Sequence, residues 1–145
     1  MSAHKSDSLE QRQAEAEILA KLSVKLGLVF GPHELGKFGV NPDGVDSSNR
    51  AIVEVYARVG GLKGSQVHKV KADLLKLVYL GSLLGPHWRK IMCFGSEEAA
   101  SSVRGKSWAA EAAKHFNVEI MVEHLSHEQK QRVVSAQSRQ KMINS

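Results

Sequence analysis

The spacing of apolar and polar residues changes several times along this chain, and each change marks an expected helix or strand. Helical patterns cover five segments: Ser8 to about Leu26, Ser65 or Gln66 to Leu83, a short one from Ser96 that Gly105 interrupts, Trp108 to His115, and Ser126 to about Met142. Strand patterns cover four: a short run through Phe38 and Val40 ahead of Pro42, the alternating run Ala51–Val59, and the apolar runs Trp88–Phe94 and Val118–Val122.

The order of these elements predicts the fold. The strand ahead of Pro42 is followed by turn residues at Gly44 and from Asp46 to Asn49, so it should pair with the Ala51–Val59 strand as an antiparallel hairpin. Each later strand follows a helix, as in a crossover unit. We therefore expect an α/β domain over residues 1–125, with a mixed four-stranded sheet flanked by helices, and a docked or fraying C-terminal helical tail over residues 126–145.

The alternating strand has two chemically different faces. One face carries only valine and alanine, and the other carries Ile52, Glu54, Tyr56 and Arg58. A half-buried strand in an antiparallel sheet has a solvated outer face, so a purely structural role explains the polar residues as well as a functional one does. The alternation alone leaves both interpretations open.

Acidic residues surround the start of this strand. Asp43 and Asp46 lie just before it and Glu54 lies within it. Mg²⁺ takes oxygen ligands, commonly one or two carboxylates together with waters and substrate phosphate, so these residues are candidates for a metal site. Either aspartate could face Glu54, in which case the other would serve the turn, where aspartate is favoured.

The charge balance adds a polyanion as the expected partner. The chain has 145 residues, with 20 Lys and Arg against 15 Asp and Glu, and a formal net charge of +5. Such an excess favours nucleic acid, whose phosphates bind lysine and arginine. The cations expected to contact phosphate follow the alternating strand: Lys63, Lys69, Lys71 and Lys76.

Other features exclude competing chemistries. Cys93 is the only cysteine and lies in an apolar run, so we expect a buried reduced thiol. Trp88 and Trp108 begin apolar elements and are expected in the core rather than as base-stacking platforms. Gly105-Lys106-Ser107 lacks the glycine five positions earlier that a phosphate-binding P-loop requires. No run of about 18 apolar residues is present, and no secretory segment opens the chain, which predicts a cytoplasmic protein without a membrane partner.

Pro42-Asp43 ahead of a strand that carries Glu54, eleven positions after Asp43, resembles the PD-(D/E)XK or restriction-endonuclease-like nuclease superfamily. The resemblance includes the order of the expected elements and covers roughly Leu9 to Val122. It implies a restriction-endonuclease-like fold and hydrolysis of nucleic-acid phosphodiesters, with DNA as the expected substrate. It also implies a Mg²⁺ (or Mn²⁺) cofactor, held by Asp43 or Asp46, Glu54 and the Val55 carbonyl, with Glu15 or Glu17 of the first helix assisting.

The chain departs from the family pattern at one position. The lysine that the family has two residues after the acid is Tyr56 here, and a neutral phenol cannot offset charge on a phosphate as an ammonium does. If the cation has moved to another position, Arg58, Lys63, Lys69 and Lys71 are the candidates, and the protein is a working or weak nuclease. If it has been lost, the protein is a non-catalytic DNA- or RNA-binding or assembly module on the same fold. A third alternative is a structural subunit whose helical tail docks a partner subunit or a second copy in a homodimer.

Overall fold

The computed structural model describes the backbone of residues 2–31 and 38–144 and the side chains of residues 9–31 and 38–140. Its helices are α1 (Ser2–Leu26), α2 (Ser65–Leu84), α3 (Glu97–Ala100), the short 3₁₀ helix η2 (Ser101–Val103), α4 (Trp108–His115) and α5 (His127–Asn144). Its strands are β1 (Gly44–Asp46), β2 (Ala51–Tyr56), β3 (Arg89–Phe94) and β4 (Val118–Val122). None of the described helices is both long and apolar enough to cross a membrane.

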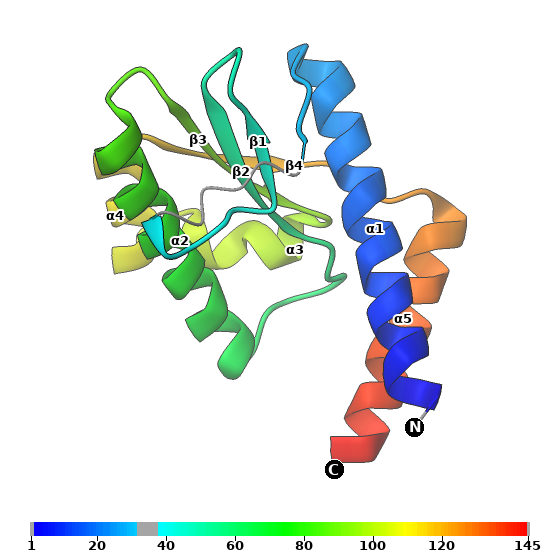
Figure 1. Cartoon of the computed structure of the whole chain (residues 1–145). Coiled ribbons are helices and arrows are strands. Elements are labelled where there is room, and N and C mark those ends of the chain that lie inside the picture. Colours follow the sequence, from blue (N-terminus) through cyan, green and yellow to red (C-terminus); the bar gives the residue numbers. More distant parts are fainter. Residues whose placement is uncertain (1, 32–37, 145) are drawn as a thin grey trace.

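The four strands form one sheet in the order β1-β2-β3-β4 (Figure 1). β1 runs antiparallel to β2, whereas β2, β3 and β4 are parallel, each connected to the next through helices. The expected α/β fold, with a mixed four-stranded sheet and a C-terminal helix, is confirmed. Most element boundaries also agree with the sequence patterns to within one or two residues, the usual uncertainty of helix and strand ends.

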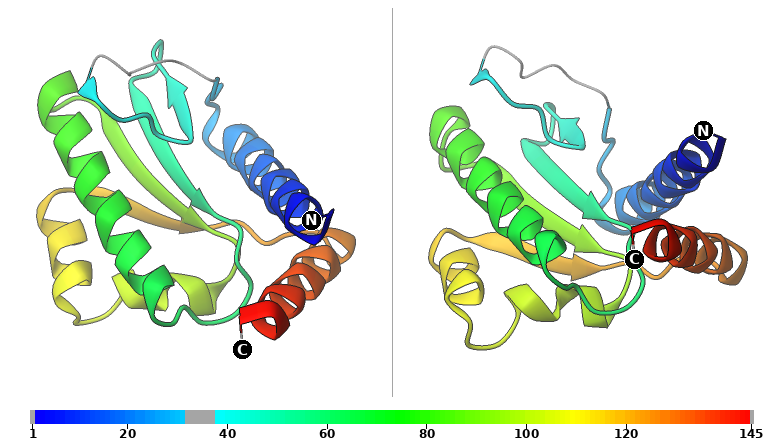
Figure 2. Two further views of the ribbon diagram at one scale, coloured as in Figure 1. Left: turned by 60° about the horizontal axis from the view of Figure 1, so that its bottom comes forward. Right: turned by 90° about the horizontal axis from the view of Figure 1, so that it is seen from below.

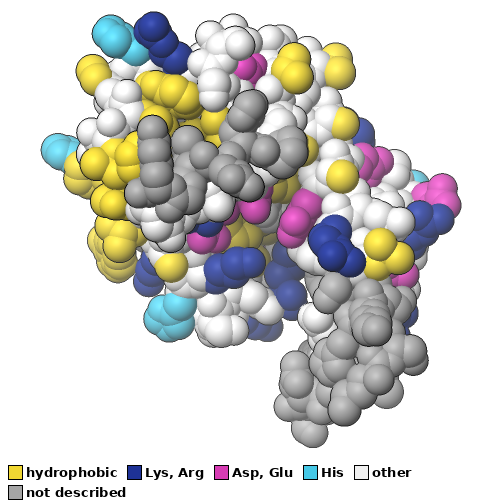
Figure 3. All heavy atoms as spheres, in the orientation of Figure 1, with side chains coloured by type: hydrophobic (Ala, Val, Ile, Leu, Met, Phe, Trp, Pro, Cys, Tyr) yellow, Lys and Arg dark blue, Asp and Glu magenta, His cyan; other side chains and the backbone are white. Residues whose placement is uncertain are grey.

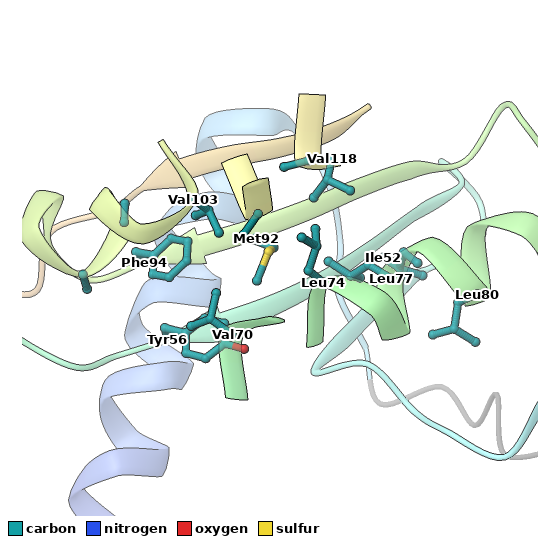
Figure 4. Packing of buried hydrophobic residues seen from close by; sticks show 14 of the residues in the cluster. Ile52, Tyr56, Val70, Leu74, Leu77, Leu80, Met92, Phe94, Val103 and Val118 are labelled. Carbon is teal, nitrogen blue, oxygen red and sulfur yellow. The ribbon is translucent and has the colours of Figure 1, made fainter. Parts of the chain in front are cut away.

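Helices cover both faces of the sheet (Figure 2). α1 and α5 lie together on one face, where Ile18, Leu22 and Val133 pack against the Val53 and Val55 side of β2. α2, α3 and α4 cover the other face. There the apolar stripe of α2 (Val70, Leu74, Leu77) packs on Ile52, Tyr56, Met92 and Phe94 (Figure 4). The sheet is therefore the middle layer of three.

This arrangement corrects the expectation of a half-buried strand. All six residues of β2 are buried, including Glu54 and Tyr56. The alternation of the sequence is real, because residues on the two faces belong to two different apolar clusters. The polar face is covered by α2 instead of solvent, and period-2 alternation cannot distinguish those two situations. An acid and a phenol thus lie in the interior, where they need partners.

The position of the first hairpin strand is a second correction. The strand is Gly44–Asp46 rather than a segment through Phe38 and Val40. Gly44 lies opposite Val53 so closely that an added Cβ would come within 2.9 Å of the Val53 side chain and 3.0 Å of Phe30. Only glycine fits at such a contact, so a residue that indicated a turn in the sequence is a strand residue chosen for close packing.

The C-terminal helix is docked. Gln137 of α5 pairs with both backbone groups of Val59, accepting from the amide at 3.0 Å and donating to the carbonyl oxygen at 3.1 Å. Arg139 also pairs with Glu10 of α1, at 3.2 Å. Few apolar residues anchor α5, and these polar contacts help hold it beside α1 and the end of β2.

Candidate active site

The carboxyl-terminal half of β2 has a neighbouring strand on one edge only. β3 pairs along the whole of β2, whereas β1 pairs no further than Val53. Beyond that point a side chain caps the free edge: the Asp43 carboxylate accepts a hydrogen bond from the Val55 amide, with Oδ2 2.8 Å from the nitrogen. Extending the hairpin register by one residue sets Asp43 opposite Glu54 on the same face of the sheet, and the charge of Asp43 acts on the Glu54 carboxyl group.

A lysine from α2 reaches the same place. The Glu54 side chain is only 4% exposed, and Lys76 Nζ lies 2.8 Å from its Oε1. The same ammonium lies 3.6 Å from Asp73 Oδ1 and donates to the Asn41 carbonyl oxygen at 3.2 Å. Lys76 therefore joins α2 to the hairpin and supplies positive charge beside Glu54. We call Asp43, Glu54, Asp73 and Lys76 the acidic cluster.

Tyr56 links this cluster to the hydrophobic core. Its ring stacks on Phe94, with centroids 5.0 Å apart, and its hydroxyl donates to the Asp73 carboxylate, with the Lys69 carbonyl oxygen as a second acceptor at 3.3 Å. Burial and the neighbouring Asp73 raise the pKa of Tyr56 far above its usual range, so it stays a neutral phenol. Tyr56 thus brings no positive charge to the position where the resemblance implies a lysine. It holds Asp73, and through Asp73 the ammonium of Lys76, in position.

The acidic cluster is short of positive charge. Burial and the nearby Asp43 carboxylate raise the pKa of Glu54 to about 8, although Lys76 acts in the opposite direction. Burial by itself would lower the pKa of Lys76, but the carboxylates of Glu54 and Asp73 outweigh that effect and raise it. Glu54 and Asp73 share the ammonium of Lys76, and Asp43 adds a third negative charge nearby, so a further cation at this place would stabilise all three carboxylates.

α1 contributes a fourth acid. Burial, followed by the charge of Asp43, raises the pKa of Glu15, so its carboxyl group lies within electrostatic reach of the acidic cluster. Glu17, the alternative in the sequence, lies elsewhere on α1, where it accepts a hydrogen bond from the Ser126 amide at 3.3 Å. The structure thus favours Glu15.

Asp46 is not part of the acidic cluster. It pairs with Ala51 across the hairpin and so points to the opposite face of the sheet from Glu54. Its carboxylate accepts hydrogen bonds from the Val29 amide and from the amide and side chain of Asn49, at 2.8 to 3.0 Å. These bonds lower the pKa of Asp46, with the Asn49 side chain contributing most. Of the two aspartates that the sequence left open, Asp46 serves the turn and Asp43 lies beside Glu54.

A cleft of about 490 Å³ adjoins the acidic cluster, at the end of β2 between α1, α2 and α5. Glu15 and Tyr56 line its boundary with the acidic cluster, and its cations are Arg12, Arg58 and Lys69. We call this the cationic cleft. Figure 3 shows acidic and basic side chains gathered on this face, in the hollow between the α1 side and the α2 side.

The other predicted phosphate contacts are dispersed. Lys71 lies over Trp108, with Nζ 5.0 Å from the ring centroid, on a different side of α2 from Lys76. Trp108 itself is 67% exposed, contrary to the expectation of a core residue. Lys63 is exposed in the loop before α2. Cys93 is buried as expected, and burial raises the pKa of its thiol to about 12.

The residues at the free edge of β2 fit a weakly held Mg²⁺ rather than a closed metal cage. Among the described residues, no three His, Cys, Asp or Glu side chains are grouped so that they could hold a metal ion. Mg²⁺, however, commonly binds one or two carboxylates and keeps several waters. Asp43 and Glu54 would supply two such carboxylates from one face of the hairpin.

No protein-family model, curated protein or solved structure matches this chain. The site must therefore be interpreted from its own geometry. Asp73 had no assigned role in the sequence analysis, and Lys76 was expected to contact phosphate rather than Glu54. Their spacing in the sequence does predict that they are neighbours, because Lys69, Asp73 and Lys76 lie four and three residues apart and share one side of α2.

Proposed function

We propose that this protein is a metal-dependent nuclease that hydrolyses a phosphodiester bond in nucleic acid, on a restriction-endonuclease-like fold. The observation that carries the proposal is the grouping of Asp43, Glu54 and Lys76: two carboxyl groups that interact electrostatically, with an ammonium 2.8 Å from one of them. The order helix, hairpin, helix, strand and the position of both acids at the hairpin also fit the family that the sequence resembles.

The cation missing from position 56 has a substitute from α2 in this proposal. Lys76 lies in α2, 20 residues after position 56, yet its ammonium lies beside Glu54 of β2, as the motif lysine would. An ammonium at this position offsets the negative charge that develops on the phosphate during cleavage. Tyr56 takes a different role, because its hydroxyl donates to Asp73 and its ring belongs to the core.

The metal ligands proposed are the carboxylates of Asp43 and Glu54 and the Val55 carbonyl oxygen, with Mg²⁺ or Mn²⁺ as cofactor. A bound divalent cation would supply an activated water and neutralise charge on the phosphate. Glu15 adds a further carboxyl group from α1, and burial together with the nearby Asp43 carboxylate raises its pKa. The ion pair with Lys76, which Asp73 also contacts, holds the Glu54 side chain in position.

The alternative is a nucleic-acid-binding module without catalysis. It is favoured by the close ion pair between Lys76 and Glu54, which already gives the buried acid one positive partner. DNA binding would then depend on the cationic cleft alone.

Cleavage assays separate these two functions. Purified protein is incubated with plasmid, linear duplex and single-stranded DNA, and with RNA, in Mg²⁺, Mn²⁺ or EDTA. The nuclease proposal predicts cleavage in Mg²⁺ or Mn²⁺ that EDTA stops and that Glu54→Gln abolishes. Glu111→Gln, a change at an exposed acid of α4, is the matched control and should cut like wild type. Binding without cleavage in any metal would favour the alternative.

A further inference from the structure

Arg58 occupies an unusual position in the cationic cleft. Its Nε atom is buried and has no hydrogen-bond acceptor, and no described Asp or Glu forms an ion pair with its guanidinium. Burial lowers its pKa, and no nearby acid offsets that effect. A partly buried guanidinium without an anion is destabilising, because desolvation weakens its charged form and nothing compensates. An anionic ligand would remove this cost.

The surroundings of Arg58 add to the excess of positive charge. Arg12 of α1 and Lys69 of α2 line the same cleft, and Glu15 is the only acid among the described residues that line it. Glu10, one turn earlier on α1, is already paired with Arg139. Among its described lining residues, the cleft therefore holds three cations against one acid.

The backbone that carries Arg58 is held rigidly. Gln137 of α5 bonds both the amide and the carbonyl of Val59, the residue directly after Arg58. A helix with little apolar packing is thus fixed to the end of β2 and forms one wall of the cleft. This fixes the backbone beside Arg58, which limits the backbone entropy lost when a ligand binds.

The dimensions of the cleft limit the ligand. Its volume, about 490 Å³, lies within the range of small-ligand pockets, roughly 300 to 1,000 Å³. Helices bound it on three sides, so one nucleotide unit fits and a double helix does not. Arginine binds phosphate oxygens through two parallel hydrogen bonds, the strongest contact that a protein side chain makes with this group.

We propose that the cationic cleft binds one phosphate group of a single-stranded nucleic acid through Arg58, with Lys69 and Arg12 beside it, next to the phosphate that is cleaved. That the phosphate belongs to nucleic acid rests on the proposed function. The phosphate site itself rests on Arg58 and the cleft.

The test measures binding in EDTA, so that it does not depend on catalysis. A fluorescent single-stranded DNA oligonucleotide, the duplex of the same sequence, and inorganic phosphate as competitor are titrated against wild type, Arg58→Gln and Arg104→Gln. Arg104 is an exposed arginine paired with Glu97, and its substitution removes the same charge away from the cleft. Thermal melting controls for folding, and Arg58→Gln should melt at or above the wild-type temperature.

The expected result is tighter binding of the single strand than of the duplex, competition by phosphate, and a loss of affinity of about tenfold in Arg58→Gln. The slope of log affinity against log salt should fall by about 0.7, the value for one phosphate contact on a single strand. Arg104→Gln should bind like wild type. The proposal is overturned if Arg58→Gln matches Arg104→Gln, if the duplex binds more tightly, or if wild type binds no oligonucleotide.

The two proposals fail separately. Arg58-dependent binding without metal-dependent cleavage would leave the phosphate site standing and reject the nuclease. Cleavage that Glu54→Gln abolishes, with binding that is unaffected in Arg58→Gln, would leave the nuclease standing and reject the phosphate site.

Discussion

The acidic cluster and the cationic cleft adjoin at the end of β2, and each carries an excess of one charge. In the acidic cluster, Glu54 and Asp73 share the ammonium of Lys76, Asp43 adds a third carboxylate, and the pKa of Glu54 rises to about 8. In the cationic cleft, Arg58 has no acidic partner among the described residues, and its pKa falls. Among the described residues, no ion pair joins the cations of the cleft to the carboxylates of the acidic cluster.

This difference has an energetic meaning. Like charges held together in a partly buried place reduce stability, and most proteins avoid them. Unbalanced charge of opposite sign in two adjacent places is what a site for a phosphodiester and its metal requires, because the metal complements one region and the phosphate the other. The acidic cluster is proposed to do the chemistry, and the cationic cleft to hold the strand.

The largest effect should come from separating these two tasks by mutation. Lys76→Met keeps much of the side-chain length and removes the ammonium beside Glu54. We expect the turnover rate to fall by about 10²-fold or more, as when a group that stabilises transition-state charge is removed, with little change in binding in EDTA. Arg58→Gln should do the opposite, weakening binding more than turnover. Steady-state kinetics and anisotropy measure the two quantities.

Equal losses of binding and turnover in both variants would contradict this division of labour. They would mean that the two regions act as one surface.

The second effect concerns Tyr56, where the family's lysine is absent. Tyr56→Lys would replace a ring stacked on Phe94 with an ammonium and remove the hydrogen bond to Asp73. We expect a loss of stability of more than about 2 kcal/mol and no gain in cleavage, because Lys76 already lies beside Glu54. Tyr56→Phe retains the stack and serves as the milder control. Urea unfolding measures both, and faster cleavage by a stable Tyr56→Lys would contradict our assignment of Lys76.

The third effect is a pH dependence that belongs to the acidic cluster alone. The pKa of Glu54 is raised from 4.5 to about 8 on folding, so the folded protein binds more protons than the unfolded chain between these values. Stability from this group is therefore present at low pH and lost as pH rises through that window, with a slope of at most about 1.4 kcal/mol per pH unit. Mg²⁺ should flatten the slope.

Denaturant unfolding of wild type and of each variant from pH 5 to 8.5 measures this dependence. The unfolding free energy of Glu54→Gln should no longer fall with pH in the way attributed to Glu54, whereas that of Arg58→Gln should fall as in wild type. The account would be contradicted if Glu54→Gln retained the full wild-type slope.

Much of the fold could be predicted because local patterns determine it. The helix Trp108–His115 and the strand Val118–Val122 have the predicted limits, since capping residues and periodicity mark them clearly. β1 could not be predicted, because a three-residue strand has no periodicity and Gly44 is there for its close contact with Val53. The burial of Tyr56 was missed because it depends on where α2 packs.

The candidate site was partly predictable for the same reason. The hairpin pattern predicted an aspartate near Glu54. Only the register of β1 against β2 shows that this residue is Asp43 rather than Asp46. Lys76 lies 22 residues after Glu54, and its approach depends on the rotation of α2 against the sheet. Arg58 was a candidate from the strand pattern, yet its lack of an acidic partner among the described residues becomes visible only when α1, α2 and α5 are assembled around it.

The proposed metal site at the free edge of β2 is tested most directly by the binding of Mn²⁺, measured by electron paramagnetic resonance of the unbound ion. Wild type is compared with Asp43→Asn, Glu54→Gln and Asp46→Asn, with folding checked by circular dichroism. The account predicts that Asp43→Asn and Glu54→Gln each weaken binding by at least about tenfold, while folded Asp46→Asn binds like wild type. Unchanged binding in Glu54→Gln, or a loss in Asp46→Asn with binding retained in Asp43→Asn, would contradict it.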